Sequence, residues 1–67
     1  MTEEKRQLLF EGFAETFDFL PVWMNQTRRA LCNKLYDSDG LNEYELEIAE
    51  LIILEGYRLK GECNVQD

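Results

Sequence analysis

The sequence has no histidine, one proline and two cysteines, and these shortages exclude several classes of function. Without histidine, the chain lacks the usual general base for a serine or cysteine nucleophile, and a zinc site would have too few soft ligands. A chain of 67 residues also leaves little room for a ligand cavity of about 300 Å³ or more. We therefore expect a protein that is not an enzyme, with no catalytic residue, no metal and no other cofactor.

Long hydrophobic runs are also lacking, since the longest unbroken one is Leu51–Leu54. A membrane-spanning helix needs about 20 apolar residues, and the N-terminal segment has glutamates where a secretory signal needs positive charge. We expect a cytoplasmic protein that does not bind membranes. In a reducing compartment Cys32 and Cys63 are expected to remain thiols, and the sequence leaves open whether they lie near each other.

Basic residues are scarce: seven stand against 14 acidic residues, which gives a formal net charge of -7. A surface this negative repels phosphate backbones and attracts basic partners. Arg28, Arg29 and Lys34 lie on an expected helix, but they scatter around its circumference and form no stripe. We expect a protein partner, one that could present a basic surface, and no direct nucleic-acid binding.

Hydrophobic spacing predicts three helices and no strand. The first helix should start after Thr2 as its N-cap and end at Pro21, the second should run from there to Tyr36, and the third should cover about Glu43–Lys60. Gly61 should end the third helix. The predicted fold is all-α: a three-helix antiparallel bundle with helix three central, forming a single domain over residues 1–62, with residues 63–67 as a frayed C-terminal tail.

The segment LYDSDGLNEYELE, residues 35–47, contains the acidic residues and glycine of a calcium-binding loop. An EF-hand needs oxygen ligands at positions 1 and 12 and glycine at position 6. Setting Asp37 at position 1, or Gly40 at position 6, places leucine or isoleucine at a ligand position. We interpret the segment instead as a turn with a left-handed Gly40, followed by a helix capped by Asn42 and Glu45 in a capping box.

Apolar residues at helical spacing predict the inward faces of the first two helices. The face of the first helix comprises Leu9, Phe10, Phe13, Ala14, Phe17 and Leu20. The face of the second comprises Met24, Thr27, Leu31 and Leu35, flanked by Trp23 and Cys32. Aromatic residues at such spacing usually pack inside a protein, so we also expect a buried aromatic cluster. Its members are Phe10, Phe13, Phe17, Trp23 and Tyr44.

The third helix is apolar on two nearly opposite sides. One stripe contains Leu41, Tyr44, Ile48, Leu51, Ile52 and Leu59, and the other contains Leu46, Ala49, Ile53 and Tyr57. Two neighbouring helices can cover one broad face, so part of the second stripe should stay uncovered and form an interface. Leu8 and Phe19, on the far side of the first helix, add to this excess. The predicted apolar partner-binding residues are Leu46, Ile53, Tyr57, Leu8 and Phe19.

Acidic residues gather on two helices. The first expected helix presents Glu4, Glu11, Glu15 and Asp18 within a narrow wedge, and the third presents Glu43, Glu47 and Glu50 on one flank. One interpretation is a solvated surface that keeps a small protein soluble. The other is an acidic partner-binding surface for a basic protein, because Lys5 and Arg6 do little to neutralise the wedge.

These patterns favour a non-enzymatic protein–protein interaction module, a self-associating regulator or adaptor that forms a homodimer or pairs with a subunit-like partner. An alternative is an acidic inhibitor of the phage or plasmid type, which would mimic nucleic acid and block a DNA- or RNA-binding protein. A weaker alternative is a helix-turn-helix DNA-binding regulator that uses the second and third helices. The sequence names neither the partner nor the process.

Overall fold

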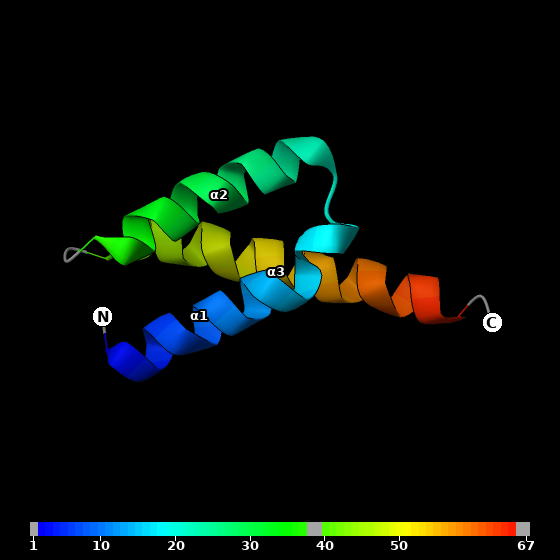
Figure 1. Ribbon diagram of the computed structural model, residues 1–67, viewed down its shortest axis with the longest axis horizontal. Helices are drawn as coiled ribbons and strands as arrows, with labels where there is room; N and C mark the ends of the chain where they lie inside the picture. Colours follow the sequence, from blue (N-terminus) through cyan, green and yellow to red (C-terminus); the bar gives the residue numbers. More distant parts are fainter. Residues whose placement is uncertain (1, 38–39, 66–67) are drawn as a thin grey trace.

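The computed structural model describes residues 2–37 and 40–65, and the regular structure in these ranges is helical. Helix α1 spans Glu3–Thr16, a 3₁₀ turn η1 spans Phe17–Phe19, α2 spans Val22–Tyr36 and α3 spans Glu43–Val65 (Figure 1). The described ranges contain no strand. The prediction of an all-α protein is therefore confirmed.

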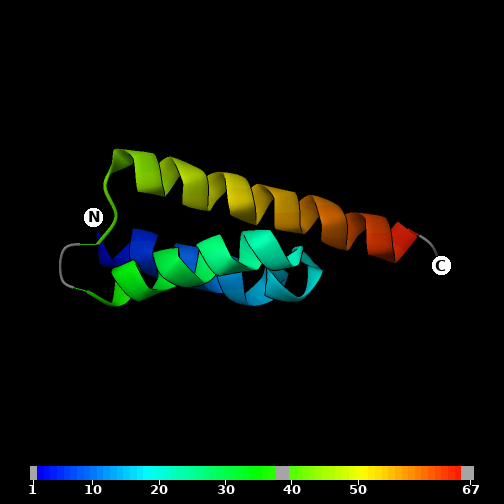
Figure 2. The same cartoon turned by 90° about the horizontal axis from the view of Figure 1, so that it is seen from above.

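The helices form two layers. Helices α1 and α2 make one layer, and α3 lies across both as the other (Figure 2). Consecutive helices run in opposite directions along the long axis of the molecule (Figure 1). The C-terminal turns of α3 extend beyond the α1–α2 layer (Figure 2). With dimensions of 42 × 24 × 16 Å, the protein is long and thin, and neither of the other described helices lies against the outer side of α3 (Figure 2).

Two helix starts are capped as predicted. The Lys5 backbone N–H donates to Thr2 Oγ1 at 3.2 Å, so Thr2 is the N-cap of α1. At the start of α3 the Glu45 N–H donates to Asn42 Oδ1 at 2.8 Å, and the Asn42 N–H donates to Glu45 Oε1 at 3.0 Å. This reciprocal pair is the predicted capping box, and such caps stabilise a helix by about 1 kcal/mol.

The first α-helix ends earlier than predicted, and a 3₁₀ turn joins it to α2. The first α-helix ends at Thr16, before Pro21, and the chain continues through η1. Pro21 is then the N-cap of α2, with φ of -63°. The side-chain amide of Asn25 donates to the carbonyls of Phe17 at 2.8 Å and Leu20 at 3.2 Å. Asn25 therefore satisfies carbonyls that the end of a helix leaves without partners.

The two glycines expected near helix ends differ in outcome. Gly40 has φ of 69°, the predicted left-handed conformation. Gly61 does not end α3, which continues to Val65, so that prediction is wrong. A Cβ at Gly61 would meet no described atom within 4 Å, and the helix tolerates the residue at a cost of about 1 kcal/mol. Of the expected frayed tail, residues 63–65 are helical and residues 66–67 lie outside the described ranges.

The core lies where α3 meets the α1–α2 layer. Its buried apolar side chains are Leu9, Phe13, Leu20, Met24, Leu31, Leu35, Ala49 and Ile52. The predicted inward faces of α1 and α2 supply most of them. Ala14 and Thr27, however, are exposed, and these two assignments are wrong.

The predicted aromatic cluster is mostly wrong. Phe13 is buried and Phe10 packs at the core edge, but Phe17 is 44% exposed, Trp23 68% and Tyr44 80%. Phe13 is thus the one ring of the predicted cluster that belongs to the buried core, which otherwise consists of aliphatic side chains and methionine.

Helices α1 and α3 approach each other closely through small residues. A Cβ on Gly56 would overlap the Cβ of Thr16, and a Cβ on Gly12 would lie 2.9 Å from the Ile53 side chain. Thr16 is fully buried, and its hydroxyl donates to the Gly12 carbonyl at 2.7 Å. Its polar atom is thereby satisfied within α1. Neither glycine nor threonine stands out in a hydropathy pattern, so the sequence analysis missed this contact.

Gly56→Ala tests the closeness of the two helices. We expect it to destabilise the protein by about 1–3 kcal/mol, because the added methyl overlaps a side chain at its branch point. Gly12→Ala should cost less, since the ends of the Ile53 side chain can move. Urea unfolding followed by far-UV circular dichroism measures both changes.

Gly61→Ala is the matched control for this series. Nothing described lies near its Cβ position, so alanine should stabilise α3 by about 0.5–1 kcal/mol. If all three alanine variants had equal stability, the close approach of α1 and α3 would be contradicted.

The capping box also predicts a dependence of stability on pH. The hydrogen bond from Lys34 and, next, that from the Asn42 N–H lower the pKa of Glu45 below its ordinary value of 4.5. A lowered pKa means that the ionised form stabilises the fold above pH 4.5, and that this stabilisation is lost as the pH falls through the lowered pKa. Glu45→Gln should therefore reduce the loss of stability in acid, measured by urea unfolding at several pH values.

Glu47→Gln provides the comparison, because Glu47 is an exposed residue of the same helix. It should leave more of the acid dependence in place than Glu45→Gln does. Identical pH profiles for the two variants would mean that the Asn42–Glu45–Lys34 contacts contribute nothing.

Candidate functional site

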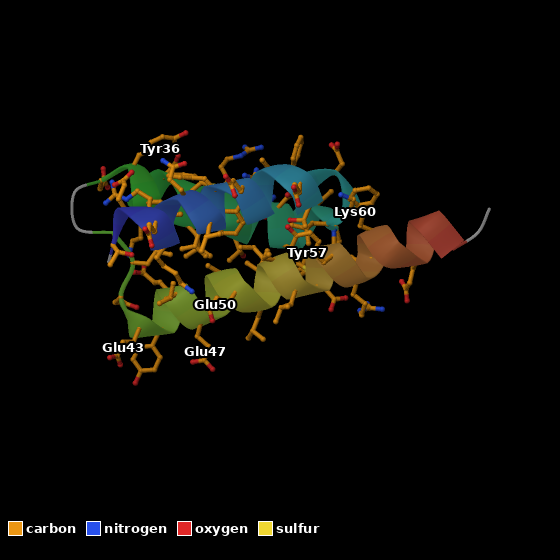
Figure 3. All side chains as sticks on the ribbon, turned by 90° about the horizontal axis from the view of Figure 1, so that it is seen from below. Tyr36, Glu43, Glu47, Glu50, Tyr57 and Lys60 are labelled. Atoms are coloured by element: carbon orange, nitrogen blue, oxygen red, sulfur yellow. The ribbon has the colours of Figure 1, made fainter. Side chains whose placement is uncertain are left out.

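The outward side of α3 carries large apolar side chains together with charged ones, among them Glu43 and Glu47 (Figure 3). Four of its side chains, Tyr44, Ile48, Leu51 and Leu54, are between 44% and 80% exposed, and we call them the α3 outer face. The sequence analysis expected part of the opposite side of α3 to be uncovered. On that side Leu46 and Ile53 are partly buried against the core and Tyr57 is 42% exposed, and their binding of a partner stays a prediction. The close contact at Gly56 turns that side of α3 toward α1 and thus turns the outer face to solvent.

A groove runs beside the α3 outer face, between α3, η1 and the start of α2. Its volume is about 780 Å³, and it is open to solvent rather than enclosed. Phe19 and Trp23 form one wall, and Ile48, Leu51 and Leu59 form the other. The sequence analysis did not expect space of this size. The space lies where the described part of α3 passes the η1–α2 corner.

The apolar surface continues from this groove onto α2. Val22 is 76% exposed and Trp23 is 68% exposed at the rim. Trp23 lines the same groove as Ile48 and Leu51, which makes the exposed area continuous. Large exposed apolar patches on small proteins usually mark interaction sites.

The other predicted apolar residues do not gather in one place. Leu8 is 63% exposed on α1, where its neighbours include Glu3, Glu4 and Glu11. Phe19 lies in η1 and lines the groove, so the helical spacing assumed for it does not apply.

Tyr57 is 42% exposed, but it is engaged with α1. Its hydroxyl donates to Glu15 Oε2 at 2.5 Å, and its ring lies on the side of α3 that faces α1 (Figure 3). This hydrogen bond, followed by burial and the charges of Glu15 and Glu11, raises the pKa of Tyr57 above its ordinary value of 10.0. Tyr57 therefore helps to join the two helices.

The predicted acidic residues divide into two groups. Glu15 bonds Tyr57, and Glu50 forms a 2.7 Å ion pair with Lys5 across α1 and α3, so both contribute to contacts within the chain. The remaining carboxylates are exposed: Glu4, Glu11, Asp18, Glu43 and Glu47. Glu43 and Glu47 project from the side of α3 away from α1 and α2 (Figure 3). Exposed ion pairs such as Lys5–Glu50 contribute at most about 1 kcal/mol.

Three basic residues, Lys5, Lys34 and Arg58, form ion pairs within the described ranges. Arg58 pairs with Glu55 and, at 2.7 Å, with Glu62, and hydrogen bonding from Arg58 lowers the pKa of Glu55. Lys34 pairs with Glu45 across α2 and α3. Arg58 thus lies next to Glu55, which lines the apolar groove.

Cys32 is partly buried, and burial raises the pKa of its thiol although Arg28 acts in the other direction. A raised pKa favours the protonated thiol over the more reactive thiolate. The Cys63 side chain lies outside the described residues, and so does any test of its nearness to Cys32. Among the side chains that are described, no group of three or more could hold a metal ion.

None of the described helices is both long enough and apolar enough to cross a membrane.

Sequence reasoning missed Val22 and Trp23, the exposed apolar side chains of α2 at the rim of the groove, and most of the α3 outer face. The signal that could have found them is the spacing of small residues. Gly12 and Thr16 are four residues apart on α1, and Ala49 and Gly56 are seven apart on α3. Small residues at these intervals share one side of a helix and permit a close backbone approach.

Comparison with known proteins assigns no family. No family model matches the chain, and no curated protein or solved structure matches it. Its function is therefore inferred from the surfaces described above.

Glu15→Gln tests the contact between Tyr57 and α1. We expect the pKa of Tyr57 to fall toward 10.0, because the first cause of its increase is the hydrogen bond to the Glu15 carboxylate. The bond stabilises the fold below pH 10 and is lost as the pH rises through the raised pKa. Carbon-13 NMR of the labelled tyrosine ring measures this pKa. Glu11→Gln is the control and should lower it less, since Glu11 is the smallest cause.

Proposed function

We propose that this protein is a non-enzymatic interaction module that self-associates through the α3 outer face and the groove beside it. The observation that supports this most strongly is the exposure of Ile48, Leu51 and Leu54 on a helix that already packs its other side against α1 and α2. In the proposed assembly α3 is the central helix, covered on one side by its own chain and on the other by a second copy.

The size of the exposed surface supports the need for a partner. A folded monomer of 8.0 kDa exposes about 4,450 Å² by the usual scaling, whereas this chain exposes 4895 Å². Its radius of gyration is 12.1 Å, compared with about 10.9 Å for a compact domain of this length. Stable dimers bury about 800 Å² per partner, and a long thin protomer can supply that area on one side.

The shape of the surface favours a second copy as the partner. A two-fold dimer requires one patch to complement itself. Here a projecting side chain, Trp23, and the open groove that it lines lie on the same face, so each protomer could insert its tryptophan into the groove of the other. Tryptophan is also the residue type that most often dominates binding energy at interfaces.

Electrostatics set the expected salt response. Two copies that each carry a net charge of -7 repel each other, while the proposed contact itself is apolar. Added salt screens the repulsion and leaves apolar contact nearly unchanged, so self-association should strengthen with salt. Binding of a basic partner to the exposed carboxylates would weaken instead.

Leu51→Glu tests the proposed interface. A charge buried in an apolar contact should weaken the dimer by about a hundredfold or more, the equivalent of about 3 kcal/mol. Sedimentation velocity over a range of micromolar concentrations, at about 0.05 M and about 0.5 M salt, measures the dimer fraction. The wild-type protein should dimerise more strongly at the higher salt concentration.

Leu8→Glu is the matched control, since it introduces the same charge at an exposed leucine outside the proposed interface. It should dimerise as the wild type does. A wild-type protein that remains monomeric at both salt concentrations, or equal weakening by both substitutions, would reject the proposal.

The acidic inhibitor is the second candidate, favoured by the exposed carboxylates on α1 and α3. The engagement of Glu15 and Glu50 within the chain reduces the acidic surface available to a basic protein. A monomer that captures a basic protein only at low salt would favour this candidate over self-association.

A further inference from the structure

A second groove lies on the side of the α1–α2 layer away from α3. Its volume is about 640 Å³, and residues of α1, η1 and α2 line it, with none from α3. The principal side chains are Phe10, Phe13, Phe17, Arg28, Cys32 and Tyr36. Figure 3 shows Tyr36 on this side of the layer. The groove is thus separate from the proposed dimer interface.

The groove has two chemically different ends. At one end the Arg28 guanidinium stands 5.7 Å from the centre of the Phe17 ring. At the other end the rings of Phe10 and Tyr36 pack with their centres 5.0 Å apart. Arg28, Cys32 and Tyr36 follow each other at intervals of four residues along α2, so the groove is about 12 Å long at 1.5 Å per residue. The Arg28 guanidinium therefore lies at one end of an apolar groove.

Arg28 is available to an anion. Its Nε donates to Asn25 Oδ1 at 3.1 Å and its Nη1 contacts Cys32 Sγ at 3.5 Å, which leaves further N–H groups of the guanidinium. Within the described part of the chain, no carboxylate lies at ion-pair distance from Arg28, although the protein has 14 acidic residues. At the opposite end Gln7 lines the groove, and its side-chain amide donates to Glu3 Oε1 at 3.4 Å. The negative charge of Glu3 disfavours a ligand carboxylate at that end.

We propose that this groove binds a linear apolar carboxylate of the medium-chain fatty-acid class. The carboxylate pairs with the Arg28 guanidinium, whose planar N–H groups match two carboxylate oxygens. The hydrocarbon chain runs past Cys32 toward the Phe10–Tyr36 pair. Cys32 suits an apolar wall, since a protonated, partly buried thiol behaves as a small apolar group.

Titration with decanoate, and with decanol as its neutral counterpart, tests the proposal. Nitrogen-15 NMR locates the binding site from shifts of backbone amides around Phe10, Phe17, Arg28 and Cys32. We expect decanoate to bind with a Kd on the order of 1 mM or below, as its few non-hydrogen atoms allow. Decanol should bind about tenfold more weakly, because it cannot form the charge-assisted hydrogen bonds.

Arg28→Met and Arg29→Met distinguish a contact with the Arg28 guanidinium from a general effect of the protein's net charge. Both remove one cation from neighbouring positions of α2, but Arg29 is exposed and does not line the groove. Arg28→Met should weaken decanoate binding about tenfold and leave decanol binding unchanged, whereas Arg29→Met should change neither. Arg28→Lys keeps the charge without the planar pair of donors and should give an intermediate loss.

Four results would overturn the proposal. They are no decanoate binding at several millimolar, equal binding of decanoate and decanol to the wild type, equal effects of the two methionine variants, and amide shifts confined to Ile48, Leu51 and Leu59. The comparison of the two ligands on the wild-type protein needs no substitution, so it remains decisive if a variant fails to fold.

Discussion

The close packing of α1 on α3 is the constraint on which the rest of the structure depends. Gly12, Thr16 and Gly56 let the two helices meet with almost no side chain between them. That contact fixes the rotation of α3 about its own axis. Once Gly56 faces α1, Ala49 and Ile52 enter the core, and Leu51 and Leu54 have to face outward. The exposed apolar surface follows from this geometry.

Local signals in the sequence predicted the helix starts well. A cap depends on residues three positions apart, so Thr2, and Asn42 with Glu45, could be recognised without knowledge of the fold. The end of α3 was harder to predict, because a glycine can either stop a helix or sit exposed within one. Gly61 does the latter, and no described atom lies near its Cβ position, a feature that the sequence alone does not reveal.

The site was harder to predict than the fold. Hydropathy assigned Trp23 and Tyr44 to the core because rings at helical spacing are usually buried. It expected Leu46 and Ile53 to stay partly uncovered because the third helix has two apolar sides, but it did not expect Ile48 and Leu51 on the other side to be exposed. Choosing between those sides requires knowing which one packs on α1. Small residues determine this, and they contribute little to an apolar pattern. The choice depends on backbone distance, which residue hydropathy does not measure.

The 3₁₀ turn between α1 and α2 contributes a ring to each of the two grooves. Phe17 belongs to the groove with Arg28, and Phe19 belongs to the groove beside α3. Asn25 holds the carbonyl of Phe17 while its own oxygen accepts a hydrogen bond from Arg28. A ligand that displaced this corner would alter both grooves together. Occupancy of one would then change affinity at the other by a reciprocal factor, as thermodynamic linkage requires.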